Sequence, residues 1–252
     1  MRSLRKLTLT DTAWDIQMIS APELADARVP VVIETVLLPP DTAGAGLWSG
    51  YDARLPTSRY TGWGAAVDRL SAQTSDMLPL TGESSLVDPL MLPAQSIAES
   101  LDAVLPTACA AVVGEGLLAT IVENILRHRN TSIGPREAED KLTLIVDTTG
   151  EPSRWSEALP GLCAEGTLLL FVPPWAGPAA LDFYPYLHRR SLRVVAKRWH
   201  HPPPSSQDPD LNELRTLIRP IVEKGRWIRP LDLNEAEVDA EVWRCFRWAP
   251  DS

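Results

Sequence analysis

Cysteine and histidine are scarce in this sequence, and neither occurs before Cys109. The 252 residues contain three cysteines and four histidines. Because protein zinc sites rely on cysteine and histidine ligands, the part of the chain before Cys109 cannot form a zinc site of that kind. The cysteines, Cys109, Cys163 and Cys245, lie far apart and form no Cys-x-x-Cys pair. We therefore expect no structural zinc site and a reduced, cytoplasmic protein.

The sequence also lacks an excess of positive charge and any long apolar run. Its formal net charge is −9, whereas nucleic acids and anionic membranes are bound by clustered cations, so we expect neither as a partner. No apolar run approaches about 18 residues, the length that a membrane-spanning helix needs. The opening MRSLRKLTLTDTAWD has no apolar core of secretory length. No nucleophile-elbow sequence occurs, so no Ser/His/Asp or Cys/His triad is predicted.

Residues 1–100 carry mostly strand-like patterns and are predicted to form a reduced, β-rich domain. The segment VPVVIETVLL is rich in β-branched residues, as expected for a strand. The following PPDTAGAGLWSGYDARLP is predicted to be a loop because of its proline, glycine and aspartate content. Further strands are predicted over 4–19 with a turn at Asp11, over 62–72 and over 78–93, followed by a helix over 94–105.

Residues 101–252 alternate between strands and helices, the pattern of a parallel α/β sheet. ACAAVV, residues 108–113, is a continuous apolar run, which is typical of a parallel strand covered on both faces. In the following LLATIVENILRHR, Leu117, Ile121 and Ile125 share one helical face. Further strands are predicted over 141–150, 166–174 and 191–199, and further helices over 153–163, 211–225 and 236–248.

The second half carries short motifs in a particular order: VVGEGLLA, IVDTTGEPSRWSEALPGLCAEGTLLLFVPP and LDFYPYLHRRSLRVVAKRW. In this order they resemble the alcohol-dehydrogenase-like branch of the medium-chain dehydrogenase/reductase superfamily. The resemblance covers roughly residues 86–248 and is weaker over 28–70. It implies an α/β fold with a Rossmann-like sheet behind a catalytic domain. The residues that occupy the positions of the family's motifs are Gly114, Gly116, Asp147, Gly150, Gly166, His188 and Arg189.

The chain departs from that family between Arg129 and Lys141. A complete Rossmann unit carries its second strand there, with an acidic end that binds the adenosine ribose. NTSIGPREAED is too short for a strand, a helix and another strand. We therefore predict a partial Rossmann-like parallel sheet in the order 1-4-5-6, in Rossmann numbering, with strands 2 and 3 missing. The first strand then becomes an edge that the N-terminal domain or a second copy of the chain would cover, and we expect a homodimer.

The predicted loss of strands 2 and 3 also affects whether a dinucleotide cofactor can bind. A glycine turn binds pyrophosphate through backbone N–H groups at a helix N-terminus, and here the turn carries Glu115 between Gly114 and Gly116. A carboxylate that points inward opposes a pyrophosphate, whereas one that points to solvent does not. Because the adenosine surface is also missing, this interpretation favours no cofactor and leaves NAD(P) open. If a nucleotide binds, Gly114, Gly116, Thr148 and Thr149 are the residues predicted to hold it.

Candidate catalytic residues are few. They are His188 in the family-like segment, His200 in a proline-rich loop, Asp147 at the end of a parallel strand, and Tyr184. Asp147 is alternatively a helix cap, and the histidines alternatively have structural roles. The density of aromatic residues predicts a hydrophobic substrate pocket, with ordinary core packing as the alternative. The residues proposed to line it are Trp48, Tyr60, Trp63, Trp175 and Trp199. No metal site is predicted.

The sequence thus predicts a truncated, zinc-free relative of the medium-chain dehydrogenases that acts on a small organic metabolite, plausibly in a specialised biosynthetic pathway. The leading hypothesis is redox-neutral chemistry such as cyclisation, isomerisation or elimination, carried by acid/base and shape effects. Two alternatives stay open. One is an NAD(P)H-dependent, zinc-independent reductase or dehydrogenase, and the other is a non-catalytic partner subunit of a full-length dehydrogenase.

Overall fold

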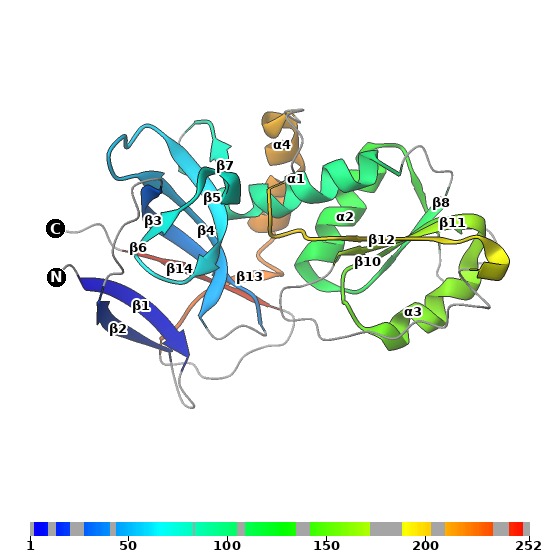
Figure 1. Ribbon diagram of the computed structural model, residues 1–252, viewed down its shortest axis with the longest axis horizontal. Coiled ribbons are helices and arrows are strands. Elements are labelled where there is room, and N and C mark those ends of the chain that lie inside the picture. Colours follow the sequence, from blue (N-terminus) through cyan, green and yellow to red (C-terminus); the bar gives the residue numbers. More distant parts are fainter. Residues whose placement is uncertain are drawn as a thin grey trace. The chain divides into compact units, whose positions relative to one another are not determined.

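The computed structural model divides into two compact units, each described here by itself (Figure 1). Unit 1 comprises Met1–Leu92, His200–Ser205 and Arg219–Ser252, and unit 2 comprises Pro93–Trp199 and Ser206–Ile218. This division differs from the expected boundary at residue 100, because the C-terminal segment belongs to unit 1. The structure describes residues 3–9, 14–20, 28–40, 44–82, 84–104, 109–134, 142–171, 188–202, 210–233 and 242–248.

Unit 1 is built on an antiparallel-rich sheet, in agreement with the predicted β-rich domain. Its strands lie in the order β13-β14-β3-β4-β5-β7, and β6 pairs with β3. A separate antiparallel hairpin consists of β1 (Ser3–Leu9) and β2 (Trp14–Ser20). The sheet strands are β3 (Val29–Leu38), β4 (Ala45–Asp52), β5 (Arg59–Ala65), β6 (Arg69–Ala72), β7 (Met77–Leu80), β13 (Ile228–Pro230) and β14 (Trp243–Arg247). A short 3-10 turn, Thr74–Asp76, precedes β7.

The loop predicted over residues 39–56 is wrong in its centre, because Ala45–Asp52 form β4. The glycines that suggested a loop are there because neighbouring backbones approach closely. A Cβ on Gly50 would lie 2.1 Å from the Val32 carbonyl oxygen. A Cβ on Gly62 in β5 would lie 2.4 Å from the ring of Trp48, its cross-strand partner. Glycine within a strand often marks such a close approach rather than a turn.

The helix predicted over residues 236–248 is wrong for Trp243–Arg247, which form β14. This strand pairs antiparallel with β3 and parallel with β13. Its apolar residues fit a helical period and a strand period about equally, and the partner that decides between them lies about two hundred residues away. Phe246 and Trp248 both pack on the hydrophobic core of unit 1.

Helix α1 (Asp88–Asp102) begins within the stretch predicted to form strands. Its start is stabilised by two reciprocal hydrogen bonds. The backbone N–H of Ser85 donates to the Asp88 carboxylate at 3.0 Å, and the Ser85 hydroxyl accepts from the N–H of Val87 at 3.2 Å. A serine followed three residues later by an acidic residue is a known signal for a helix N-terminus. The sequence therefore contained the signal for this helix.

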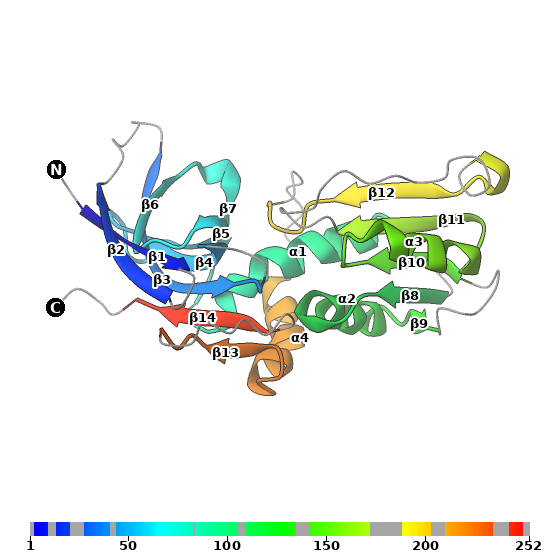
Figure 2. The ribbon, with the colours of Figure 1, turned by 90° about the horizontal axis from the view of Figure 1, so that it is seen from below.

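Unit 2 contains a fully parallel sheet in the order β12-β11-β10-β8-β9 (Figure 2). Its strands are β8 (Cys109–Val113), β9 (Ser132–Ile133), β10 (Leu142–Asp147), β11 (Leu162–Phe171) and β12 (Arg193–Lys197). The helices are α2 (Gly116–His128), α3 (Pro152–Ala158) with the 3-10 turn Leu159–Gly161, and α4 (Leu211–Glu223), whose last residues belong to unit 1. No helix in the described part of the chain is long and apolar enough to cross a membrane.

The predicted Rossmann-like order is confirmed, since β8, β10, β11 and β12 lie in the places of strands 1, 4, 5 and 6. The structure adds β9, a two-residue parallel strand on the outer edge of β8, so a short strand occupies the place of Rossmann strand 2, which was predicted to be missing. The chain therefore runs from β8 through α2 to β9 and only then to β10. This short strand pairs with Cys109 and Ala110, at the N-terminal end of the β8 edge.

Candidate functional site

The turn between β8 and α2 has the backbone geometry of a nucleotide-binding glycine turn. Gly114 and Gly116 both have positive φ angles, +117° and +91°, which residues other than glycine rarely adopt. A Cβ on Gly114 would also lie 2.3 Å from the Thr148 hydroxyl oxygen. Glycine at these two positions is therefore required by the fold of the turn.

The N-terminus of α2 has no cap from its own N-cap residue. Glu115 occupies the N-cap position with an extended backbone, and its side chain makes no capping hydrogen bond. The residue is exposed, as expected for a carboxylate that points to solvent. The positive end of the helix dipole thus remains open to an anion.

Arg154 brings a positive charge close to this turn. Its guanidinium donates to the Glu151 carboxylate at 2.8 Å. That hydrogen bond and the charge of Glu151, and more weakly the charge of Glu115, raise the pKa of the Arg154 guanidinium. The charge of Arg154 thus acts mainly on Glu151, its hydrogen-bond partner, and only weakly on Glu115. Sequence analysis missed Arg154, although a basic residue at the start of the helix that follows Asp147–Gly150 was a visible signal.

Asp147 is fully buried at the carboxyl end of β10, and its carboxylate is surrounded by donors. It accepts hydrogen bonds from the Thr149 N–H at 3.1 Å, the Thr149 hydroxyl at 2.7 Å and the Gly150 N–H at 2.9 Å. The indole Nε1 of Trp155 donates to the same carboxylate at 2.8 Å. This arrangement suits a group that fixes the turn after β10 and joins it to α3.

Thr148 and Thr149 connect the two turns at the carboxyl edge of the sheet. The Thr148 hydroxyl donates to the Val113 carbonyl at 3.1 Å, and the Thr148 N–H donates to the same oxygen at 3.0 Å. The Thr149 hydroxyl accepts from the Glu151 N–H at 3.0 Å. The structure therefore brings Gly114 and Thr148 together, as the predicted nucleotide site requires.

The candidate histidines have different surroundings. His200, in unit 1, is buried, and its ring centroid lies 5.6 Å from that of Trp63 and 4.7 Å from that of His201. His188 is exposed in a short helical turn. Tyr184 and Trp175 lie outside the described residues. The catalytic roles of these residues stay predictions.

The remaining aromatic candidates range from core to half-buried positions. Trp48 is 1% exposed in the core of unit 1, and Trp199 is 0% exposed. Tyr60 is half-buried against the same core as Trp48, and Trp63 is half-buried beside His200. Core packing accounts for the burial of Trp48 and Trp199, whereas Trp63 has both partial exposure and a titratable neighbour. Of these four residues, Trp63 therefore best suits a pocket wall.

Zinc and a dinucleotide differ in how well the described residues suit them. No group of three or more His, Cys, Asp or Glu side chains among these residues could hold a metal ion. A zinc centre therefore does not fit the described part of the chain. The Gly114–Gly116 turn, by contrast, has two positive-φ glycines at a helix N-terminus, and helix N-termini favour anions.

The sequence matches no protein-family model and no curated protein. Solved structures do match. Glucose dehydrogenase of Haloferax mediterranei, in complex with NADP, Zn and gluconolactone, has a TM-score of 0.65 at 10% identity, over 99% of this chain and 100% of that one. Acetophenone reductase of Geotrichum candidum, in complex with NAD, has a TM-score of 0.66 at 9% identity, over 97% of both chains. 2R,3R-butanediol dehydrogenase of Bacillus subtilis has a TM-score of 0.59 at 13% identity, over 98% of this chain and 100% of that one.

The chain shares its fold with these dehydrogenases. The likeness agrees with the α/β fold and the Rossmann-like parallel sheet that the motif order implied. At such low identity it concerns the fold alone, so the predictions that the chain is truncated and free of zinc remain predictions.

Proposed function

We propose that this chain is an NAD(P)-dependent oxidoreductase of a small organic molecule that works without a zinc ion. The observation that carries the proposal is the Gly114–Glu115–Gly116 turn, with two positive-φ glycines at the uncapped N-terminus of α2. Ligands of open α/β sheets lie beyond the carboxyl ends of the strands, which is where this turn lies. The NADP- and NAD-bound structures of the same fold support it.

In this proposal the chain's own residues bind and orient the cofactor. Backbone N–H groups of Gly116 and Leu117 would hold the pyrophosphate, and Arg154 would offset the charge of Glu115 only weakly. Thr148 would contact the cofactor from the end of β10. A bound nicotinamide supplies or accepts the hydride.

Redox-neutral acid/base chemistry is the second candidate, and the length of β9 favours it. This strand has two residues, so it offers little surface beside β8 for the adenosine half of a dinucleotide. His200, which lies beside Trp63 in unit 1, would then act as the acid or base on a substrate that needs no hydride, because imidazole is the side chain best suited to proton transfer near neutral pH. One property distinguishes the two candidate functions: only the first requires NAD(P) to bind.

A titration of NADPH and NADH, followed by cofactor fluorescence, tests the proposal on three proteins. Glu115→Gln removes a negative charge beside the α2 N-terminus, so binding should tighten by about 0.3–1 kcal/mol, roughly two- to fivefold in Kd. Glu123→Gln is the control, because Glu123 lies further along the same helix and pairs with Arg127 at 2.9 Å. Its affinity should equal that of the wild type. The proposal fails if neither cofactor binds any of the three proteins at about 1 mM.

A further inference from the structure

The hairpin of unit 1 ends in a strand, β2, whose outer side pairs with no other strand in the described part of the chain (Figure 1). β1 and β2 form a two-stranded sheet of their own. β1 is bound on its other side, where Lys6 forms a β-bridge with Val67. We call the outer side of β2 the β2 edge.

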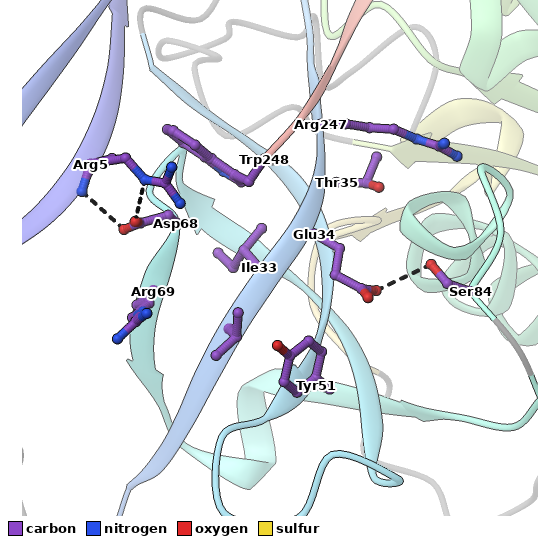
Figure 3. Close-up of a pocket in the computed structure, with 11 residues that line it drawn as sticks. Arg5, Ile33, Glu34, Thr35, Tyr51, Asp68, Arg69, Ser84, Arg247 and Trp248 are labelled. Carbon is purple, nitrogen blue, oxygen red and sulfur yellow. Dashed lines mark hydrogen bonds and ion pairs between the residues drawn. The ribbon is translucent and has the colours of Figure 1, made fainter. Parts of the chain in front are cut away.

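The backbone hydrogen bonds of β1 show which residues of β2 face outward. Directly opposite residues of an antiparallel pair either bond to each other or direct their N–H and C=O groups apart. Arg5 lies opposite Met18 but bonds to Asp68, which accepts from the Arg5 N–H at 2.9 Å and donates its own N–H to the Arg5 carbonyl at 2.9 Å. Figure 3 shows the Asp68 carboxylate held by the Arg5 backbone and side chain. The N–H and C=O groups of Met18 therefore point to the β2 edge.

The next residues along the hairpin follow the same alternation. Leu7, which lies opposite Ile16, donates its N–H to the Ala66 carbonyl at 2.8 Å, on the side away from β2. Trp14, two residues before Ile16, donates its N–H to the Leu233 carbonyl at 3.1 Å, on the side away from β1. Since residues two apart in a strand face the same side, Ile16 also directs its N–H and C=O groups to the β2 edge.

The side chains of this strand are exposed and almost uncharged. Residues 15–18 are all exposed. Met18, at 64%, is the most exposed large apolar side chain in the described part of the chain, and Ile16 is 37% exposed. Natural edge strands prevent pairing with lysines, prolines or bulges, whereas β2 has neither lysine nor proline and pairs with β1 in an unbroken register. The β2 edge therefore lacks the usual protection against pairing.

The sequence of β2 is complementary to a second copy of itself in the antiparallel direction. With Gln17 on a two-fold axis, Gln17 lies opposite Gln17 of the second copy, and Ile16 lies opposite Met18 twice. Each Ile16–Met18 pair would exchange two backbone hydrogen bonds and cover two exposed apolar side chains. The two Gln17 amides each carry a donor and an acceptor for the other. An axis at Met18 would instead place Ile16 opposite Ser20 and lose the apolar pairs.

We propose that the β2 edge binds the β2 edge of a second copy of this chain, so that two hairpins form one antiparallel sheet across a two-fold axis at Gln17. Such an interface is isologous, since the same residues contribute from both copies. Asp15, the charged residue of β2, would lie opposite Ile19, so like charges do not face each other. The contact lies in unit 1 and goes beyond the proposed function. The homodimer predicted from the sequence would thus form through β2 rather than through β8.

A cysteine at the axis tests the register. In Gln17→Cys, the two new thiols would belong to directly opposite residues with Cα atoms about 4.5 Å apart, a distance that a disulfide spans. Mild oxidation should give a covalent dimer on a non-reducing gel. Lys6→Cys is the matched control, because Lys6 lies opposite Gln17 on β1 and its two copies would be about 14 Å apart. It should give no more covalent dimer than the wild type, whose three cysteines set the background.

A charge on the β2 edge tests the surface itself. Met18→Lys removes an apolar contact and adds the side chain that commonly protects edge strands. Sedimentation equilibrium should show a dimer for the wild type and a dissociation constant at least about tenfold higher for Met18→Lys. Leu55→Lys is the matched control, because Leu55 is 55% exposed and lies in the connection between β4 and β5. Its dissociation constant should equal that of the wild type.

Three results would overturn the proposal. One is a wild-type protein that is monomeric at about 0.1 mM. Another is a Met18→Lys variant that dimerises as tightly as the wild type. The third is covalent dimer formed as efficiently by Lys6→Cys as by Gln17→Cys. All three measurements are made without NAD(P), so the NADPH titration reports separately on the proposed function.

Discussion

Asp147 is the residue for which a catalytic role and a structural role are hardest to tell apart. A carboxylate at the carboxyl end of a parallel strand is well placed for acid/base chemistry, and a capping role was the alternative. Its burial and its hydrogen bonds from Thr149, Gly150 and Trp155 favour the structural role. A buried carboxylate with this many donors holds its turn in place because each donor would otherwise lack a partner.

Substitution Asp147→Asn should therefore lower the free energy of unfolding by about 2–4 kcal/mol, because the amide nitrogen would face donors and the charge-assisted hydrogen bonds would be lost. Urea denaturation measures this loss. Asp76→Asn is the control, because Asp76 is exposed and should change stability by less than about 0.5 kcal/mol. If Asp147→Asn unfolds like the wild type yet loses catalytic activity, Asp147 acts in the chemistry instead.

At the scale of elements, what the sequence predicted and what it missed have separate physical causes. The strand at residues 29–38 followed from a local apolar pattern, and the order of the parallel strands followed from the resemblance to the dehydrogenase family; both are confirmed. The strand β4 was missed because its glycines suggested a loop. They are needed where the β3 backbone approaches closely, and the sequence alone does not show that approach. The strand β14 was missed because its partner is remote in sequence. The Gly114–Gly116 turn was found from sequence, and Arg154 could have been, because it lies at the start of the helix that follows Asp147–Gly150.

The account of β4 predicts different outcomes for two glycines. In Gly50→Ala, the new Cβ would lie 2.1 Å from the Val32 carbonyl oxygen and 2.9 Å from the Ile33 Cα, both backbone atoms that cannot easily move. The free energy of unfolding should fall by about 2 kcal/mol or more. In Gly64→Ala, the Cβ would lie 3.5 Å from the Trp48 indole nitrogen, an ordinary contact. Thermal denaturation should show this control within about 0.5 kcal/mol of the wild type, and equal losses would contradict the account.

At the scale of the whole molecule, the chain has the fold of the three matched dehydrogenase and reductase structures, while its described residues include no group that could hold a metal ion. Identities of 9–13% to the three dehydrogenase structures leave the fold in common while side chains differ throughout. What persists in unit 2 is backbone geometry, namely the glycine turn at the carboxyl edge of a parallel sheet. Backbone sites tolerate sequence change because they rely on N–H groups rather than side chains. Binding of NAD(P) at this turn, as proposed, is therefore compatible with the low identity to these structures.

A crystal structure of the protein grown with saturating NADPH tests this central claim most directly. The account predicts a dinucleotide whose pyrophosphate accepts hydrogen bonds from the N–H groups of Gly116 and Leu117, at about 2.7–3.2 Å. The Glu115 side chain should remain directed to solvent in the complex. A structure under these conditions in which the turn holds no nucleotide, or in which the nucleotide lies elsewhere on the chain, would contradict it.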